Sequence, residues 1–60
     1  MKKIEAYQFL KQHSDENFRL YVSTRMCETF YVFGSGLNLA KLVLGLPSSN
    51  LYNISTNEIL

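Results

Sequence analysis

The stretch FRLYVSTRMCETFYVF, residues 18–33, decides the fold of this 60-residue chain. Within it, residues 18–23 and 28–33 alternate roughly with a period of two, and both are rich in aromatic and β-branched side chains. This pattern is typical of strands. The stretch therefore predicts two strands joined as a hairpin.

A helix over the same stretch is the competing interpretation. The connection at 24–27 lacks the Gly, Asn or Asp that a tight hairpin prefers. Two strands are nevertheless favoured, because Arg19, Arg25 and Thr29 would otherwise lie within the apolar face of the helix. The apolar residues that recur at helical spacing are Phe18, Val22, Met26 and Phe30.

Helices are predicted on both sides of this region. Residues 2–13 contain good helix formers and neither Gly nor Pro. Residues 37–46 form a leucine-rich run that ends before Pro47. The glycines at 34–36 indicate a sharp turn between strand and helix. We predict one small α+β domain over residues 1–60, built as helix, two-stranded hairpin, helix and short C-terminal segment.

The C-terminal part of the chain also allows an all-α fold, since residues 51–54 suit either a short helix or a short strand. Residues 40–54, AKLVLGLPSSNLYNI, resemble a bacterial helix-turn-helix, with an apolar helix, a turn glycine and a Ser-rich start to a second helix. That resemblance implies a helix-turn-helix-like C-terminal half and a DNA-binding transcriptional regulator. The second helix would bring no Arg or Lys to the phosphates, so DNA is the alternative partner and not the favoured one.

The leucine-rich run predicts self-association. On a helical wheel its polar positions, Asn38, Lys41 and Gly45, form one narrow stripe. A chain of this length lies near the lower limit for independent folding and has little surface with which to cover the other sides of the helix. We therefore expect a second copy to cover them in a dimer. The expected self-association residues are Leu39, Leu42, Val43 and Leu46.

Composition and single residues argue against several classes of protein. The net charge of +1 gives no footprint for phosphate-backbone binding. The lone Cys27 is read as a small, half-buried residue, and without an intrachain disulfide a cytoplasmic setting is expected. The leucine-rich run is about half the length of a membrane span, so no membrane association is expected. His13 is the only histidine and lacks a patterned partner. We expect a non-enzymatic protein without cofactor or metal.

Tyrosine and arginine side chains are the remaining candidates for function, because both types anchor protein interfaces. On the first predicted strand Arg19, Tyr21 and Ser23 share a face. On the second, Thr29, Tyr31 and Phe33 share another, so one face of the hairpin is expected to be aromatic and amphipathic. The expected function is a protein-binding module, an inhibitor or modulator of a protein partner. The expected partner-binding residues are Tyr7, Arg19, Tyr21, Arg25 and Tyr31.

Overall fold

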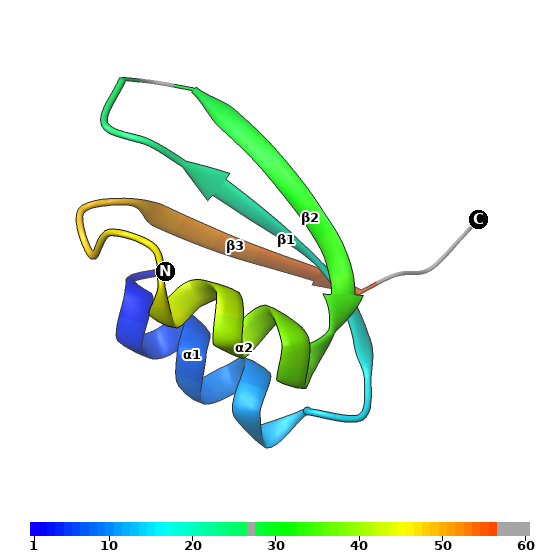
Figure 1. Ribbon diagram of the computed structural model, residues 1–60. Helices are drawn as coiled ribbons and strands as arrows, with labels where there is room; N and C mark the ends of the chain where they lie inside the picture. The colour runs from blue at the N-terminus through cyan, green and yellow to red at the C-terminus, as the bar shows by residue number, and fades with distance from the viewer. Residues whose placement is uncertain (27, 57–60) are drawn as a thin grey trace.

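The computed structural model describes residues 1–26 and 28–56, so the reading of Cys27 lies outside the described residues. The predicted α+β fold is confirmed, with two helices and an antiparallel sheet (Figure 1). The elements in chain order are α1 (Lys3–Gln12), β1 (Asn17–Ser23), β2 (Thr29–Ser35), α2 (Gly36–Leu44) and β3 (Leu51–Thr56).

The sheet has the order β2-β1-β3, so β1 is the central strand and pairs antiparallel with both neighbours. Phe18, Leu20 and Val22 of β1 are buried, while the residues between them are half-buried. Both helices lie on one side of the sheet (Figure 1). Since side chains alternate along a strand, one face of the sheet packs on the helices and the other face is left without a covering layer.

The two helices run antiparallel and pack against each other. The Lys3 side chain, at the start of α1, donates a hydrogen bond to the Leu44 carbonyl oxygen at the end of α2, at 3.1 Å. At the opposite end, the first residue of α2 lies against the carbonyl groups of Leu10 and His13. The two helices therefore form one packed layer over the sheet.

The core lies between the helix layer and the sheet. Its largest enclosed side chain is Tyr52 of β3, which is fully buried and donates from its hydroxyl to the Pro47 carbonyl oxygen at 2.7 Å. A buried hydroxyl needs such a partner, because an unpaired polar group costs free energy away from water. The enclosed apolar residues are Ala6, Leu10, Phe18, Leu20, Val22, Leu39, Ala40, Val43 and Tyr52.

Helix α2 keeps its predicted polar stripe at the surface, since Asn38, Lys41 and Gly45 are all exposed. The opposite side of the helix enters the chain's own core. The two flanks between these sides are apolar and partly exposed, with Leu37 at 47% and Leu44 at 55%. The buried side of α2 is therefore covered by the chain's own core, whereas the flanks stay partly exposed.

The four residues expected at a self-association surface are divided by this arrangement. Leu39 and Val43 are 2% and 0% exposed and belong to the core of the single chain. Leu42 is exposed at 36%, and Leu46 is half-buried against the core. Leu39 and Val43 are therefore not accessible at the surface of the folded chain.

The helix-turn-helix resemblance is wrong for this fold. Residues 51–54, which would lie within the second helix, belong to strand β3 and pair with β1. The pairing brings Tyr52 opposite Val22 and Ile54 opposite Leu20 on the helix-facing side of the sheet. The apolar residues of this segment are thus used by a strand at alternate positions.

The chain passes from strand to helix within residues 34–36, as predicted, but without a separate turn segment. Strand β2 continues through Gly34, and α2 begins at Gly36. No glycine of the chain has the positive φ that a turn glycine commonly supplies. Gly36 is needed for a different reason, because its Cα lies so close to the end of α1 that a Cβ would collide with two backbone carbonyl oxygens.

Candidate protein-binding surface

The face of the sheet opposite the helices is the candidate site, and we call it the open face. The registers of the two strand pairs align its side chains in rows across β2, β1 and β3. No described element lies over it (Figure 1). The open-face residues are Thr29, Tyr31 and Phe33 of β2, Arg19, Tyr21 and Ser23 of β1, and Leu51, Asn53 and Ser55 of β3.

An aromatic cluster with one arginine occupies the β1–β2 half of the open face. The rings of Tyr21 and Tyr31, which lie opposite each other on adjacent strands, have centroids 5.7 Å apart. The Arg19 guanidinium carbon lies 5.1 Å from the centroid of the Tyr31 ring, within the range of a cation–π interaction. Arg19 also donates from Nη1 to the Tyr21 hydroxyl at 3.3 Å. These contacts hold the three side chains in one arrangement.

Among the described residues, Arg19 is the only charged one on the open face. Its hydrogen bond to Tyr21 raises the pKa of the guanidinium above its ordinary value, so the group is cationic at physiological pH. Its Nε is enclosed and makes no hydrogen bond within residues 1–26 and 28–56. A guanidinium carries five N–H donors in a planar fork. The Nη groups can therefore offer further donors to a carboxylate of another molecule.

Large apolar side chains flank this cluster. Tyr31 is 61% exposed, Phe33 52% and Leu51, at the start of β3, 59%. Tyr31 and Phe33 follow each other on the same face of an edge strand, and Arg19 lies opposite Phe33 in the register. Exposed single apolar residues are ordinary, but several on one uncovered face mark an interaction surface.

The structure brings three of the five predicted partner-binding residues together. Arg19, Tyr21 and Tyr31 form the cluster just described. Arg25 is exposed in the connection between β1 and β2, outside the cluster. Tyr7 is half-buried on α1, in the other layer of the molecule, and packs against the core.

The alternation of side chains along the second strand predicted that Phe33 shares a face with Tyr31, but Phe33 was not among the expected partner-binding residues. Leu51 was missed completely. The alternation in residues 28–33 carried the signal for Phe33. No local signal identifies Leu51, because its place on the open face depends on the pairing of β3 with β1.

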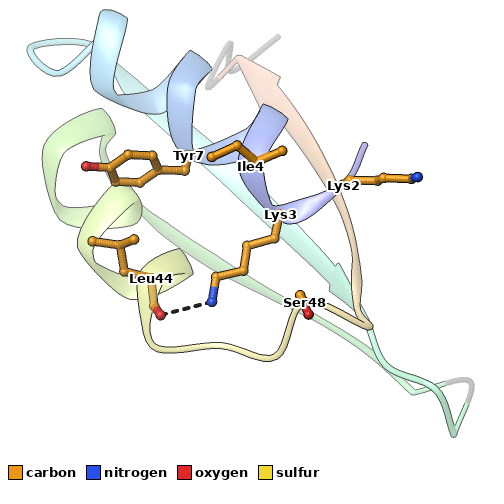
Figure 2. Close-up of a pocket in the computed structure, with 6 residues that line it drawn as sticks. All are labelled: Lys2, Lys3, Ile4, Tyr7, Leu44 and Ser48. Carbon is orange, nitrogen blue, oxygen red and sulfur yellow. Dashed lines mark hydrogen bonds between the residues drawn. The ribbon is translucent and has the colours of Figure 1, made fainter.

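A pocket lies between the start of α1 and the end of α2, apart from the open face (Figure 2). It is an open pocket of about 340 Å³ with a mainly apolar lining. Lys3 crosses it to reach the Leu44 carbonyl oxygen, as Figure 2 shows. That hydrogen bond also places a cation at the C-terminal end of α2, where the helix dipole favours it. The lining residues are Lys2, Lys3, Ile4, Tyr7, Leu44 and Ser48.

The contacts of His13, the one histidine of the sequence, are those of a residue at the end of a helix. His13 caps the end of α1, its Nδ1 lies 2.5 Å from a carboxylate oxygen of Glu16, and its ring packs 4.6 Å from that of Phe9. In residues 1–26 and 28–56, no group of three or more His, Cys, Asp or Glu side chains could hold a metal ion. Among the same residues, no helix is long and apolar enough to cross a membrane.

Comparison with known protein families, curated proteins and solved structures gives no match to this chain. The geometry of its surfaces is therefore the basis for a functional proposal.

Proposed function

We propose that the chain is a non-enzymatic protein-binding module, an inhibitor or modulator that docks a protein partner on the open face of its sheet. The observation that carries this proposal is the aromatic cluster of Arg19, Tyr21 and Tyr31 on a face that no described element covers. Tyr and Arg are enriched at the energetic centres of protein interfaces, because each combines a large contact area with a polar end.

The size of the apolar surface supports a docking role. A Tyr or Phe side chain contributes about 150–250 Å² when it is buried, so the exposed parts of the neighbouring Tyr31 and Phe33 amount to roughly 200 Å². Leu51, on the other outer strand, adds a separate exposed apolar side chain to the same face. Apolar surface gathered on one uncovered face often marks an interaction site. A partner that covers it would gain hydrophobic stabilisation and would meet one fixed cation.

The charge distribution favours a protein partner over a nucleic acid. Only Arg19 lies on the open face, and Arg25 lies near the tip of the hairpin. The four lysines are on or beside the helices, in the other layer. A nucleic-acid surface needs a row of cations along the phosphate backbone, in addition to aromatic rings for stacking. The open face instead suits a partner with an apolar surface and a carboxylate that can reach Arg19.

The proposal can be tested by site-specific photo-crosslinking. A benzophenone side chain is placed at Tyr31, on the open face, or at Lys41, which is exposed on the helix layer. Both variants are expressed in the cells that produce the protein, irradiated and examined by mass spectrometry. We expect adducts with one other protein from position 31 and not from position 41.

A second variant pair makes the crosslinking result specific. Arg19→Ala is expected to reduce the yield of the adduct from position 31 at least about tenfold if the guanidinium pairs with a buried partner carboxylate. Lys11→Ala, on the helix layer, should leave the yield unchanged. Equal labelling from positions 31 and 41, or adducts from position 31 that contain only a second copy of the chain, would contradict the proposed function.

A further inference from the structure

Strand β2 forms a free edge of the sheet. The Thr24 amide donates to the Glu28 carbonyl oxygen at 2.8 Å. The Gly36 amide donates to the Glu16 carbonyl oxygen, also at 2.8 Å. These bonds continue the β1–β2 ladder at its two ends. Hydrogen-bonded pairs occur at every second residue of an antiparallel ladder, so the even-numbered residues of β2 face β1. The groups that point away from the sheet are the amides and carbonyls of Thr29, Tyr31 and Phe33, together with the amide of Ser35, whose carbonyl accepts the first hydrogen bond of α2.

The opposite edge of the sheet is treated differently. On β3, the Tyr52 amide donates to the Met1 carbonyl oxygen at 2.8 Å, and the Met1 amino group donates to the Tyr52 carbonyl oxygen at 2.6 Å. The start of the chain thus occupies this edge at Tyr52. No described residue does the same for β2.

The sequence of β2 also lacks the usual protections of an edge strand. Proteins discourage pairing at exposed edges with charged side chains, proline, bulges or very short strands. Thr29–Ser35 reads TFYVFGS, which contains no charged residue and no proline, and it pairs with β1 over all seven residues without a bulge. This strand is therefore competent to accept another strand.

We propose that β2 is the self-association edge of the protein, on which a second copy pairs its own β2 in antiparallel orientation. The two three-stranded sheets then form one continuous sheet across a twofold axis. An antiparallel arrangement is self-complementary, as a twofold interface requires. This inference does not rest on the proposed function, because it is argued from the backbone edge of β2, although the side chains of Tyr31 and Phe33 contribute to both surfaces.

One register is favoured by the side chains of β2. If the twofold axis passes between the two Val32 residues, Tyr31 of each copy lies opposite Phe33 of the other, and Thr29 lies opposite Ser35. Tyr31 and Phe33 then form complete hydrogen-bonded pairs across the axis, and each Ser35 amide can donate to the Thr29 carbonyl oxygen of the other copy. The Ser35 carbonyl takes no part, because it accepts the first hydrogen bond of α2.

The side chains fit this register on both faces of the joined sheet. On the open face, each Tyr31 meets a Phe33 of the other copy, which is a favourable aromatic cross-strand pair. On the helix side, each Phe30 lies opposite Gly34 of the other copy. Phe30 is 43% exposed in the single chain, and a glycine opposite it leaves room for the ring to cover the backbone. Because β2 contains no charged residue, the pairing brings no like charges together.

The area involved indicates a weak dimer. The exposed parts of Phe30, Tyr31 and Phe33 are roughly 300 Å² per chain, about 600 Å² for the pair before the strand backbones are counted. Specific interfaces bury about 1,200–2,000 Å² in total, and weaker ones less. Association through β2 should therefore depend on concentration, with dissociation on dilution.

Sedimentation across a dilution series and amide hydrogen exchange measured by NMR test this proposal together on the unmodified chain. We expect a monomer–dimer equilibrium over about 10 μM to 1 mM. Over the same range, the amides of Tyr31 and Phe33 should become protected by about tenfold or more in exchange rate. The internal control is Ile54, whose amide points out from the other edge, and its exchange should not change with concentration.

The register is tested by cysteine trapping in a Cys27→Ser background. The two Val32 residues would form a non-hydrogen-bonded pair with Cα atoms about 4.5 Å apart, so Val32→Cys should give a disulfide dimer. Tyr31→Cys and Phe33→Cys should not, since each faces a different residue. A monomer at every concentration would overturn the proposal, as would a dimer in which the Tyr31 and Phe33 amides exchange freely. A dimer trapped at 31 or 33 in preference to 32 would overturn the register.

Discussion

Replacing Gly36 by alanine should remove a third or more of the stability of this chain. A Cβ at this position would lie 2.5 Å from the Leu10 carbonyl oxygen and closer still to that of His13. Both obstacles are backbone atoms at the end of α1, so no side chain can rotate away. The start of α2 must instead move outward from α1.

The magnitude follows from the contacts that this movement disturbs. Overpacking a core by one carbon costs about 1–3 kcal/mol, and a clash with rigid backbone lies at the upper end. Displacing Gly36 also strains its hydrogen bond to the Glu16 carbonyl oxygen, at 2.8 Å, for about 1 kcal/mol more. The restriction of the unfolded chain returns about 0.4–1 kcal/mol. The net loss is about 3 kcal/mol, against a total of about 3–9 kcal/mol for 60 residues.

Circular dichroism with urea and thermal unfolding measures this loss at a fixed protein concentration. A loss of about 3 kcal/mol lowers the melting temperature by roughly 12–24 °C in a domain of this size. Gly45→Ala is the matched control, because a Cβ there would meet only the Leu42 carbonyl oxygen at 3.6 Å and the backbone is already helical. It should be neutral or slightly stabilising. If Gly36→Ala unfolds within about 0.5 kcal/mol of the unchanged chain, the close approach of the two helices is wrong.

Three further predictions concern the core, a buried hydroxyl and the surface of α2. Leu20→Ala, at a fully buried position on the central strand, should cost about 2–5 kcal/mol in urea unfolding, whereas Lys41→Gln should stay within about 0.5 kcal/mol. Tyr52→Phe should cost about 1–3 kcal/mol, because the Pro47 carbonyl oxygen loses its donor. Burial raises the pKa of the Tyr52 hydroxyl above its ordinary value of 10, so the unfolded chain loses this proton at a lower pH than the folded chain does. The free energy of unfolding should therefore fall as the pH rises above about 10. The fall should be less steep in Tyr52→Phe, which lacks the hydroxyl. Leu44→Asp should leave the chain folded, with a loss below about 1 kcal/mol, because this side chain is 55% exposed; complete unfolding would show that it is enclosed.

Local patterns predicted most of the elements. Alternation in residues 18–23 and 28–33 indicated both strands, and helical periodicity with Pro47 indicated α2. The polar stripe of α2 was also predicted, because wheel geometry depends only on neighbours three and four residues apart. The second strand extends two residues further than expected, through Gly34 and Ser35, since its pairing with β1 continues to Asn17.

The role of β3 could not be predicted, for a physical reason. Its apolar positions, such as Tyr52 and Ile54, are too few to separate a short strand from a short helix. Their conformation is set by pairing with Val22 and Leu20, about thirty residues earlier in the chain. The same long-range pairing puts Leu51 on the open face. Local propensity carries no information about it.

The purpose of Gly36 was also hidden from sequence reasoning, which associates Gly-Ser-Gly with a turn. A glycine at a close approach of two helices has the same sequence signature as a glycine in a tight turn. Only the position of α1 separates the two, because the constraint is the space beside the Cα and not the backbone angle.

The open face is not explained by the needs of folding. The core is enclosed between the helices and one side of the sheet, and it uses none of the open-face residues. Threonine or serine would satisfy the strand propensity of an uncovered face and would remain hydrated. The chain instead carries Tyr31 and Phe33 there, on a strand whose outer backbone groups are also unprotected. A free edge of this kind favours aggregation, and the folding of the single chain requires neither this edge nor the aromatic face, which is why both proposals are built on them.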